Sequence, residues 1–218
     1  MTPELANAVD PIFLHVLHLL ESIRSGNRHN SMDERAKIDV LLAAAETTLG
    51  NSSKWQLCKY ALVSWIDELL VETHWDGREW WGNNVIEMEI FNSRACYEMF
   101  FVKAKEASAL ADRDAMEIFY ICVMLGFRGL YEDSDIAASI IESHNLPPTL
   151  DRWTQQAALS IRSGSGRPPL VGKKHDIRGA PLRGGIQAAV WTWFGAGLLS
   201  FAGILYYLLI LSARDSYP

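Results

Sequence analysis

Residues 53–73 read SKWQLCKYALVSWIDELLVET, and this stretch decides the fold because apolar side chains cover it on nearly every side. A helix with this pattern belongs at the centre of a helical bundle, since a surface helix keeps a broad polar face. We expect Ser52 or Ser53 to cap its start. Its few polar side chains fall at i, i+3, i+4 and i+8 and predict one narrow acidic stripe: Ser64, Asp67, Glu68 and Glu72.

The sequence on either side predicts more helices. Upstream, Asp10 and Pro11 are typical of a helix start, and the apolar face that follows ends at Gly26. A capping box of Ser31 and Glu34 opens a second helix, which ends at Gly50. Downstream, the same signals predict an ordered loop or short helix at 75–84 and then helices from about Val85, through Tyr97 to Phe101, from Asp112, from Asp133 or Ser134 to Ser143, and from Pro148 to Ile161.

The run that follows Asp112, AMEIFYICVMLGF, predicts a second central helix. Its apolar segment from Ile118 to Leu125 is far too short to cross a bilayer, so it belongs inside the bundle. No alternating strand pattern with hairpin turns occurs anywhere in the sequence. The predicted fold class is therefore all-α: a cytoplasmic helical bundle domain that covers residues 1–161.

The C-terminal part predicts a membrane anchor. Residues 191–211 read WTWFGAGLLSFAGILYYLLIL, and no charged side chain lies between Gly184 and Ala213. About 20 apolar residues are enough to cross the hydrocarbon core of a bilayer. We therefore expect a basic linker rich in Gly, Pro and Ser at 162–185, one transmembrane helix at 186–213, and a short periplasmic tail at 214–218.

The charge distribution predicts the orientation and limits the partners. Seven Lys or Arg residues lie between Arg152 and Arg183 against Asp176 alone, so the positive-inside rule places the large domain in the cytoplasm. Residues 1–151 hold 24 Asp or Glu and 12 Lys or Arg, an acidic balance that argues against nucleic acid as a partner. The basic linker is interpreted either as a topology signal or as a contact with anionic lipid headgroups.

Catalytic and metal-binding signals are weak. The sequence lacks the common phosphate-binding, nucleophile-elbow and zinc motifs, and we expect neither a cofactor nor an enzymatic activity. His15 and His18 have a spacing that two ligands of one metal could share, but a structural role is favoured. Asp67 and Glu68 could be an acid/base pair, yet neighbours on a helix diverge by about 100°. Cys58 and Cys122 are expected in the core, and the cysteine spacing fits a reducing compartment.

Several segments together resemble the DotU/TssL family, also called IcmH, of bacterial type VI and type IVB secretion systems. The resemblance rests on 60–75, on FNSRACYEMFF at 91–101 and on MEIFYICVMLGFRGLY at 116–131. The strongest element is Leu-Gly-Phe-x-Gly-x-Tyr at 125–131. The family element Gly-Gly-Glu-x-Phe-Phe is half kept, since Glu98, Phe100 and Phe101 match while Cys96 and Tyr97 replace the glycines.

The resemblance implies a role in assembly. Members of this family have a hook-like cytoplasmic domain of two small bundles, anchored in the inner membrane by a single span. The implied partners are a TssM/IcmF-like inner-membrane protein and the cytoplasmic baseplate proteins. The sequence does not distinguish type VI from type IVB. A lipid-binding adaptor and a tail-anchored enzyme are the alternative functions that the sequence leaves open.

Two sets of residues are candidates for contacts with partners. The first is acidic and comprises Asp67, Glu68, Glu72 and Glu98, which we interpret as a surface for basic partner segments. The alternative is a solvated or intramolecularly paired face. The second set is a stripe of small residues at i+4 spacing, Ala188, Thr192, Ala196 and Ser200, which predicts a homodimer through the transmembrane helix. The alternative is a helix that is merely rich in small residues.

Overall fold

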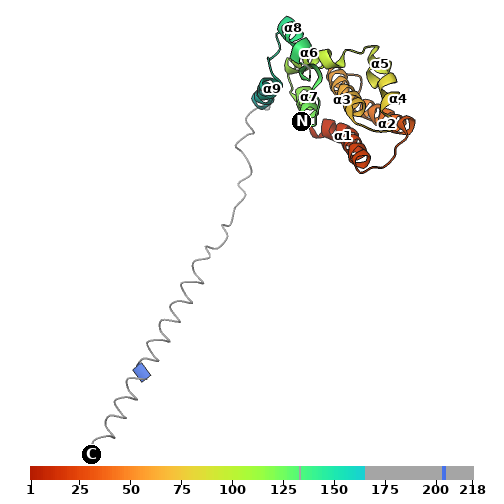
Figure 1. The fold of residues 1–218 in the computed structure, drawn as a ribbon. Coiled ribbons are helices and arrows are strands. Elements are labelled where there is room, and N and C mark those ends of the chain that lie inside the picture. The colour runs from red at the N-terminus through yellow and green to blue at the C-terminus, as the bar shows by residue number, and fades with distance from the viewer. Residues whose placement is uncertain (133, 165–202, 205–218) are drawn as a thin grey trace, which may run out of the picture. The chain divides into compact units, whose positions relative to one another are not determined.

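The computed structural model describes residues 1–132, 134–164 and 203–204, and within them it contains helices only (Figure 1). The helices of the N-terminal half are α1 (Pro3–Arg24), α2 (Ser31–Leu49), α3 (Ser53–Glu72), α4 (Arg78–Asn83) and α5 (Ile86–Phe91). They are followed by α6 (Cys96–Ser108), α7 (Asp114–Met124), the 3-10 turn η1 (Gly129–Tyr131), α8 (Ser134–Ser143) and α9 (Leu150–Gly164). The predicted all-α class is confirmed for these residues.

Helix α3 is the central helix, as its all-round apolar pattern predicted. It packs against α4, α5, α6 and α7, and both Trp55 and Trp65 are fully buried in it. Ser52 caps its start, because the Ser52 side chain accepts a hydrogen bond from the backbone N–H of Trp55 at 3.1 Å. Cys58 and Cys122 lie in the core without solvent exposure, so their predicted role as small core residues is confirmed.

Helices α1, α3 and α7 run parallel to one another. At their N-terminal ends, the backbone N–H and the hydroxyl of Thr2 donate to the Asp114 carboxylate at 2.9 and 2.7 Å, and Lys54 lies 3.4 Å from the same group. Toward the other end, the indole of Trp65 donates to the carbonyl of Leu125 at 3.5 Å. The C-terminal ends of α3 and α7 therefore lie together, and the candidate site is built there.

The predicted start of the first helix is wrong. Helix α1 begins at Pro3 rather than at Asp10, and Pro11 lies inside it. Pro11 removes one backbone hydrogen bond, but Leu5 and Val9 are buried on the same face as Ile12, and burying each such side chain contributes about 1.5–3 kcal/mol. Burial of the earlier turns therefore outweighs the local cost of the proline.

Two predicted caps are shifted by one residue. Asn30, not Ser31, caps α2, since its side chain accepts from the backbone N–H groups of Met32 and Asp33. Helix α7 begins at Asp114, whose backbone N–H donates to Asp112 at 3.2 Å, although the capping position itself is Arg113. The predicted end of α2 at Gly50 is confirmed. An oxygen side chain one position away can supply the same acceptor, so the sequence left these boundaries ambiguous.

The predicted linker at 162–185, span at 186–213 and tail at 214–218 lie almost entirely outside the described residues. The same holds for Ala188, Thr192, Ala196 and Ser200. Among the helices that the structure describes, none combines the length and the apolar character that crossing a membrane requires. The membrane anchor and the two-bundle, hook-like outline stay predictions.

Candidate functional site

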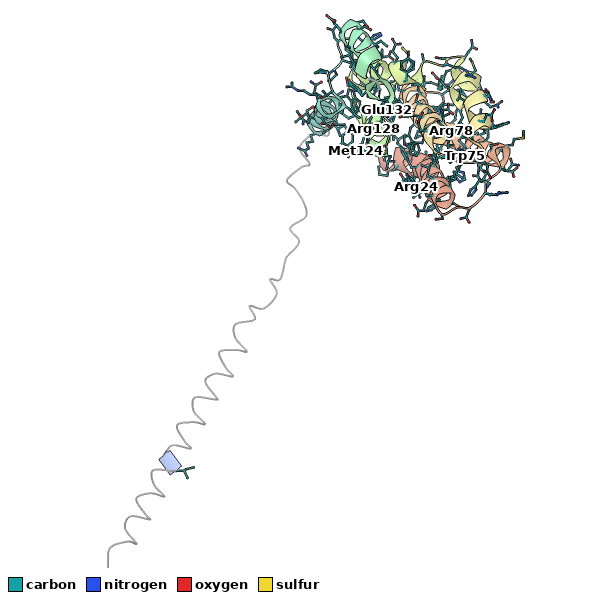
Figure 2. The ribbon with its side chains drawn as sticks, in the orientation of Figure 1. Arg24, Trp75, Arg78, Met124, Arg128 and Glu132 are labelled. Atoms are coloured by element: carbon teal, nitrogen blue, oxygen red, sulfur yellow. The ribbon has the colours of Figure 1, made fainter. Side chains whose placement is uncertain are left out.

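A cleft of about 570 Å³ opens beside the C-terminal end of α3. Its walls come from the last two turns of α3, from Val85 and Glu87 at the start of α5, and from Cys96 and Tyr97 at the start of α6. The remaining wall is the segment from Gly126 to Glu132, which includes η1. Arg128 and Glu132 of this segment are labelled in Figure 2. The cleft thus gathers residues from the central helix and from the two most family-like parts of the sequence.

The end of α3 is held by side chains from the following segment. The indole N–H of Trp75 donates to the carbonyl of Leu70 at 2.8 Å, and Arg78 donates through Nε to the carbonyl of Val71 at 2.6 Å. Both residues are labelled in Figure 2. The last carbonyl groups of a helix have no partner within it, so these bonds satisfy them. The chain reversal that leads into α4 is fixed in this way.

Asp67 is buried, with 2% of its surface exposed, and holds the start of α5. Its Oδ1 accepts from the indole of Trp81 and from the backbone N–H of Ile86, both at 3.0 Å, and its Oδ2 accepts from the backbone N–H of Glu87 at 2.8 Å. Burial raises the pKa of Asp67 to about 6, although the three donors oppose this. This carboxylate is intramolecularly paired and positions α4 and α5 against α3.

Glu68 is half-buried and holds a different element. Its two carboxylate oxygens accept from the backbone N–H groups of Arg128 and Gly129, the latter at 2.8 Å. Burial raises the pKa of Glu68 to about 7, and the neighbouring charges of Glu132 and Glu72 act in the same direction. Asp67 and Glu68 therefore face separate parts of the fold, as adjacent residues on a helix should. Their oxygens are engaged by backbone donors, which argues against an acid/base pair.

The Leu-Gly-Phe-x-Gly-x-Tyr element builds the wall that Glu68 holds. Gly129 has a φ of +49°, and a Cβ at this position would lie 2.7–2.9 Å from the ring of Phe127 and the carbonyl oxygen of Tyr97. Only glycine fits this close approach. Phe127 stacks on Phe100 with ring centroids 3.9 Å apart, and the Tyr131 hydroxyl donates to the carbonyl of Pro147 at 2.6 Å. The element thus joins α6, α7 and the segment before α9.

The rim of the cleft carries the accessible charges. Glu72 and Glu132 are exposed, and among the described residues no side chain bonds to the carboxylate of Glu72. Arg128 is also exposed, and Arg94 donates to the carbonyl of Asn83 at 3.3 Å. Glu72 is thus the only residue of the predicted acidic stripe that is exposed to solvent. Glu132, from a distant part of the sequence, lines the same cleft. No spacing rule links residues 72 and 132, so sequence reasoning missed this pair.

Glu98 lies outside the cleft lining. It is half-buried on α6, and its carboxylate is 3.0 Å from Nε2 of His144, which follows α8. The two residues that replace the family glycines, Cys96 and Tyr97, start α6 and line the cleft instead. Burial raises the pKa of the Cys96 thiol well above its ordinary value. The departure from the family pattern therefore changes the cleft wall without preventing the helix.

The two histidines considered as possible metal ligands lie on α1 in different surroundings. His15 contacts the buried carboxylate of Glu34 at 3.1 Å, while His18 is exposed. Glu34 also contacts His29 at 3.4 Å and Lys37 at 2.7 Å. Within residues 1–132, 134–164 and 203–204, no group of three or more His, Cys, Asp or Glu side chains is arranged to hold a metal ion. The favoured structural role of His15 agrees with this geometry.

Comparisons with known proteins place this fold among secretion components. A family model described as "Type VI secretion system protein DotU" matches residues 4–211. The solved cytoplasmic domain of TssL from Acinetobacter baumannii is similar, with a TM-score of 0.56 and 23% sequence identity over 73% of this chain and 98% of that chain. At this identity the likeness shows the fold alone. No curated protein matches the sequence.

Proposed function

Because the chain belongs to the DotU family of type VI secretion proteins, we propose that it is a structural scaffold that links the inner membrane to the cytoplasmic baseplate. The family is a structural component of the secretion system and is not known as a family of enzymes. The carboxylates of Asp67 and Glu68 fit a structural protein, because each accepts hydrogen bonds from backbone N–H groups of another element. Both side chains serve the architecture of the cleft.

The proposed topology has a cytoplasmic domain at 1–161, a linker at 162–185, a single span at 186–213 and a periplasmic tail at 214–218. The match of the family model up to residue 211 supports an anchor that belongs to the family pattern. Protease added to spheroplasts tests the orientation. We expect an epitope at the N-terminus to be protected until the membrane is permeabilised, and digestion without permeabilisation would contradict the proposal.

The observation that carries the scaffold proposal is a cleft with fixed inner walls whose lining has more acidic than basic side chains: Asp67, Glu68, Glu72, Glu87 and Glu132 against Arg94 and Arg128. Backbone donors hold Asp67 and Glu68 in place, so the shape of the cleft is set before a partner arrives. Glu72 and Glu132 at the rim are free to attract a basic segment of a partner, because complementary charge steers docking and selects partners. The proposed partners are a TssM/IcmF-like membrane protein and the baseplate proteins. Their basic segments are the proposed occupants of the cleft.

Reversal of the rim charges tests the role of the cleft. The double variant Glu72→Lys with Glu132→Lys keeps Asp67 and Glu68 intact, so it changes the charge of the cleft without removing its supports. We expect the amount of each proposed partner that co-purifies from membranes to fall at least about tenfold, because like charges across an interface are repelled. Unchanged co-purification by a folded double variant would rule out the cleft as the docking site.

The matched control is Glu106→Lys, an exposed carboxylate on α6 with no side-chain partner among the described residues. Glu106 lies ten residues after Cys96 on that helix, which places it about 15 Å along the axis from the cleft wall. Its reversal changes the net charge in the same direction and should leave co-purification unchanged. An equal loss in this control would indicate an effect of net charge rather than of the cleft.

We also propose self-association of the anchor through Ala188, Thr192, Ala196 and Ser200. Small residues at this spacing let transmembrane helices approach closely. Ala196→Leu and Ser200→Leu should each weaken the signal in a membrane two-hybrid assay, while Leu205→Ile, which falls on the opposite face of a helix with 3.6 residues per turn, should not. An undiminished signal with both leucine variants would show that this stripe is not the interface.

A further inference from the structure

The carboxylate of Glu68 lies among acidic side chains that come from two segments of the chain. Glu72 follows it on α3 by four residues, and Glu132, labelled in Figure 2, follows η1. All three side chains line the cleft of about 570 Å³. Residues four apart on a helix are neighbours on its surface, and like charges at this spacing repel each other. Ionisation of all three side chains therefore concentrates negative charge in one cavity.

The surroundings of these carboxylates supply little opposing charge. The cleft lies at the C-terminal ends of α3 and α7, where the helix dipoles are negative. The backbone N–H groups of Arg128 and Gly129 that donate to Glu68 are dipoles without net charge. Arg94 and Arg128 also line the cleft, but within the residues that the structure describes neither forms an ion pair with a carboxylate. The surplus of negative charge is therefore not neutralised inside the domain.

Glu68 is the lining group that responds to this surplus near neutral pH. It is half-buried, and burial together with the charges of Glu132 and Glu72 raises its pKa to about 7 against the opposing effect of the two backbone donors. At pH 7 about half of the molecules therefore carry a proton on this carboxyl group. No histidine is among the described residues that line the cleft, so the change of charge there near pH 7 comes from carboxyl groups.

The other titratable groups of the lining are less suited to this role. Asp67 accepts from three donors, and burial raises its pKa only to about 6, below that of Glu68. Glu87 accepts a hydrogen bond from a buried tyrosine hydroxyl at 3.0 Å. Burial holds the pKa of the Cys96 thiol well above its ordinary value, so the thiol stays neutral, and the phenol of Tyr97 is neutral at pH 7 as well. Glu68 is therefore the group whose ionisation a docked cation changes most.

We infer that docking of a basic segment in the cleft releases a proton from the Glu68 carboxyl group to solvent, so that docking strengthens as the pH rises through neutrality. The inference rests on the proposed function of the cleft and adds its regulation. A guanidinium or ammonium group between Glu68, Glu72 and Glu132 stabilises the ionised form of all three side chains. Linkage requires the converse, so a chain with a protonated Glu68 binds the cation less tightly.

Binding of hexa-arginine to the purified full chain in a neutral detergent tests this coupling, because the guanidinium group stays charged at every pH used. Calorimetry at pH 7 in two buffers with different heats of ionisation gives the number of protons released. We expect about half a proton per bound peptide, and about tenfold tighter binding at pH 8 than at pH 6. Binding without proton release and with equal affinity at the two pH values would overturn the inference.

Single substitutions assign the proton to Glu68. Glu68→Gln keeps a side-chain oxygen that can accept from the backbone but has no titrating proton, so its binding should release none and should be equal at pH 6 and pH 8. Glu72→Gln, at an exposed position, should release less than the unaltered chain, because less negative charge surrounds Glu68. Glu106→Gln, exposed on α6, is the matched control and should release the same amount as the unaltered chain. Release that persists in Glu68→Gln, or that is equal in Glu72→Gln and Glu106→Gln, would contradict the inference.

Co-purification distinguishes failure of this inference from failure of the proposed function. The double variant Glu72→Lys with Glu132→Lys should bind hexa-arginine at least about tenfold more weakly at both pH values. If neither hexa-arginine nor the proposed partners bound the unaltered chain at pH 8, the docking role itself would fail, and this inference with it. If the partners co-purified in the same ratio at pH 6 and pH 8 with the unaltered chain as with Glu68→Gln, only the inference would be overturned.

Discussion

At the two ends of the parallel helices α3 and α7, the pKa values of buried and half-buried carboxylates shift in opposite directions. At the N-terminal end, Asp114 accepts from Thr2 and lies beside the ammonium group of Lys54. Burial alone would raise its pKa, but the Thr2 hydrogen bonds and Lys54 outweigh burial and lower it. At the C-terminal end, Asp67 and Glu68 accept mainly from backbone N–H groups, and burial raises their pKa to about 6 and about 7.

This difference shows what each end contributes. A cation and the N-terminal end of a helix dipole both favour an ionised carboxylate, so Asp114 keeps its charge and fastens the chain start to α7. At the C-terminal end the dipole has the opposite sign, and Glu132 and Glu72 add further negative charge near Glu68. Ionisation there is costly. The N-terminal end thus stabilises the contact between the chain start and α7. At the C-terminal end, ionised carboxylates are unfavourable in the folded chain alone, and this is the cleft that we propose binds a basic partner.

The largest expected effect comes from removing Asp67. Asp67→Ala leaves the N–H groups of Trp81, Ile86 and Glu87 buried without their acceptor, so we expect the free energy of unfolding to fall by about 3–5 kcal/mol. Chemical denaturation followed by circular dichroism measures this change. The control Asp33→Ala, at an exposed acid of α2, should change stability by less than about 0.5 kcal/mol. Similar values for the two variants would show that Asp67 does not hold α5.

A smaller loss is expected at the opposite end. Asp114→Ala removes the acceptor of Thr2 and the partner of Lys54, and we expect a cost of about 2 kcal/mol. A double-mutant cycle with Lys54→Met separates the ion pair from the Thr2 bonds. The coupling should be below about 1 kcal/mol because Lys54 also contacts the exposed Asp112. If the coupling accounted for the whole loss, the Thr2 bonds would not contribute as this comparison requires.

The smallest expected effect is a pH dependence of opposite sign at the two ends. Glu68 binds its proton more tightly in the folded than in the unfolded chain, so its contribution favours folding at low pH and is lost as pH rises from about 4.5 to about 7. Asp114 has a lowered pKa, so its contribution is present at neutral pH and is lost in acid below its ordinary pKa. Unfolding free energies measured from pH 3 to pH 8 reveal both slopes.

Glu68→Gln isolates the contribution of the cleft. The variant cannot ionise at position 68, so the decline of stability between pH 5 and pH 7 should become shallower by about 1 kcal/mol or more. The loss of stability below pH 4 should be the same in the variant, because it depends on Asp114 and other carboxylates with a lowered pKa. A variant that keeps the full decline would show that Glu68 is already ionised at pH 5, and the contrast between the two ends would fail at this residue.

Local sequence signals predicted most of the helices but misplaced some starts. The end of α2 at Gly50 and the Ser52 cap of α3 depend on a few neighbouring residues, and the structure confirms both. The start of α1 was predicted wrongly at Asp10 and Pro11. The hydrogen bond that Pro11 removes can be predicted from the local sequence, whereas the burial of Leu5 and Val9 that offsets this loss depends on other helices. Patterns in a single sequence indicate local backbone energies, but they do not indicate burial against distant helices.

The candidate site shows the same limit. The sequence singled out Asp67, Glu68 and Glu72 from their spacing on one helix, but it did not say which of them face solvent. That depends on Trp81, Ile86 and Gly129, which arrive from later segments and engage the first two carboxylates. Glu132, the residue after η1, lines the same cleft without any sequence relation to Glu72.

The sequence by itself determined the helical class, the central position of α3 and the family, because apolar periodicity and compact motifs are properties of adjacent residues. Only the tertiary structure decided that two of the three stripe carboxylates act as internal acceptors and that Glu132 lines one cleft with Glu72. The physical reason is that hydrogen-bond satisfaction and burial depend on residues brought together from distant parts of the chain.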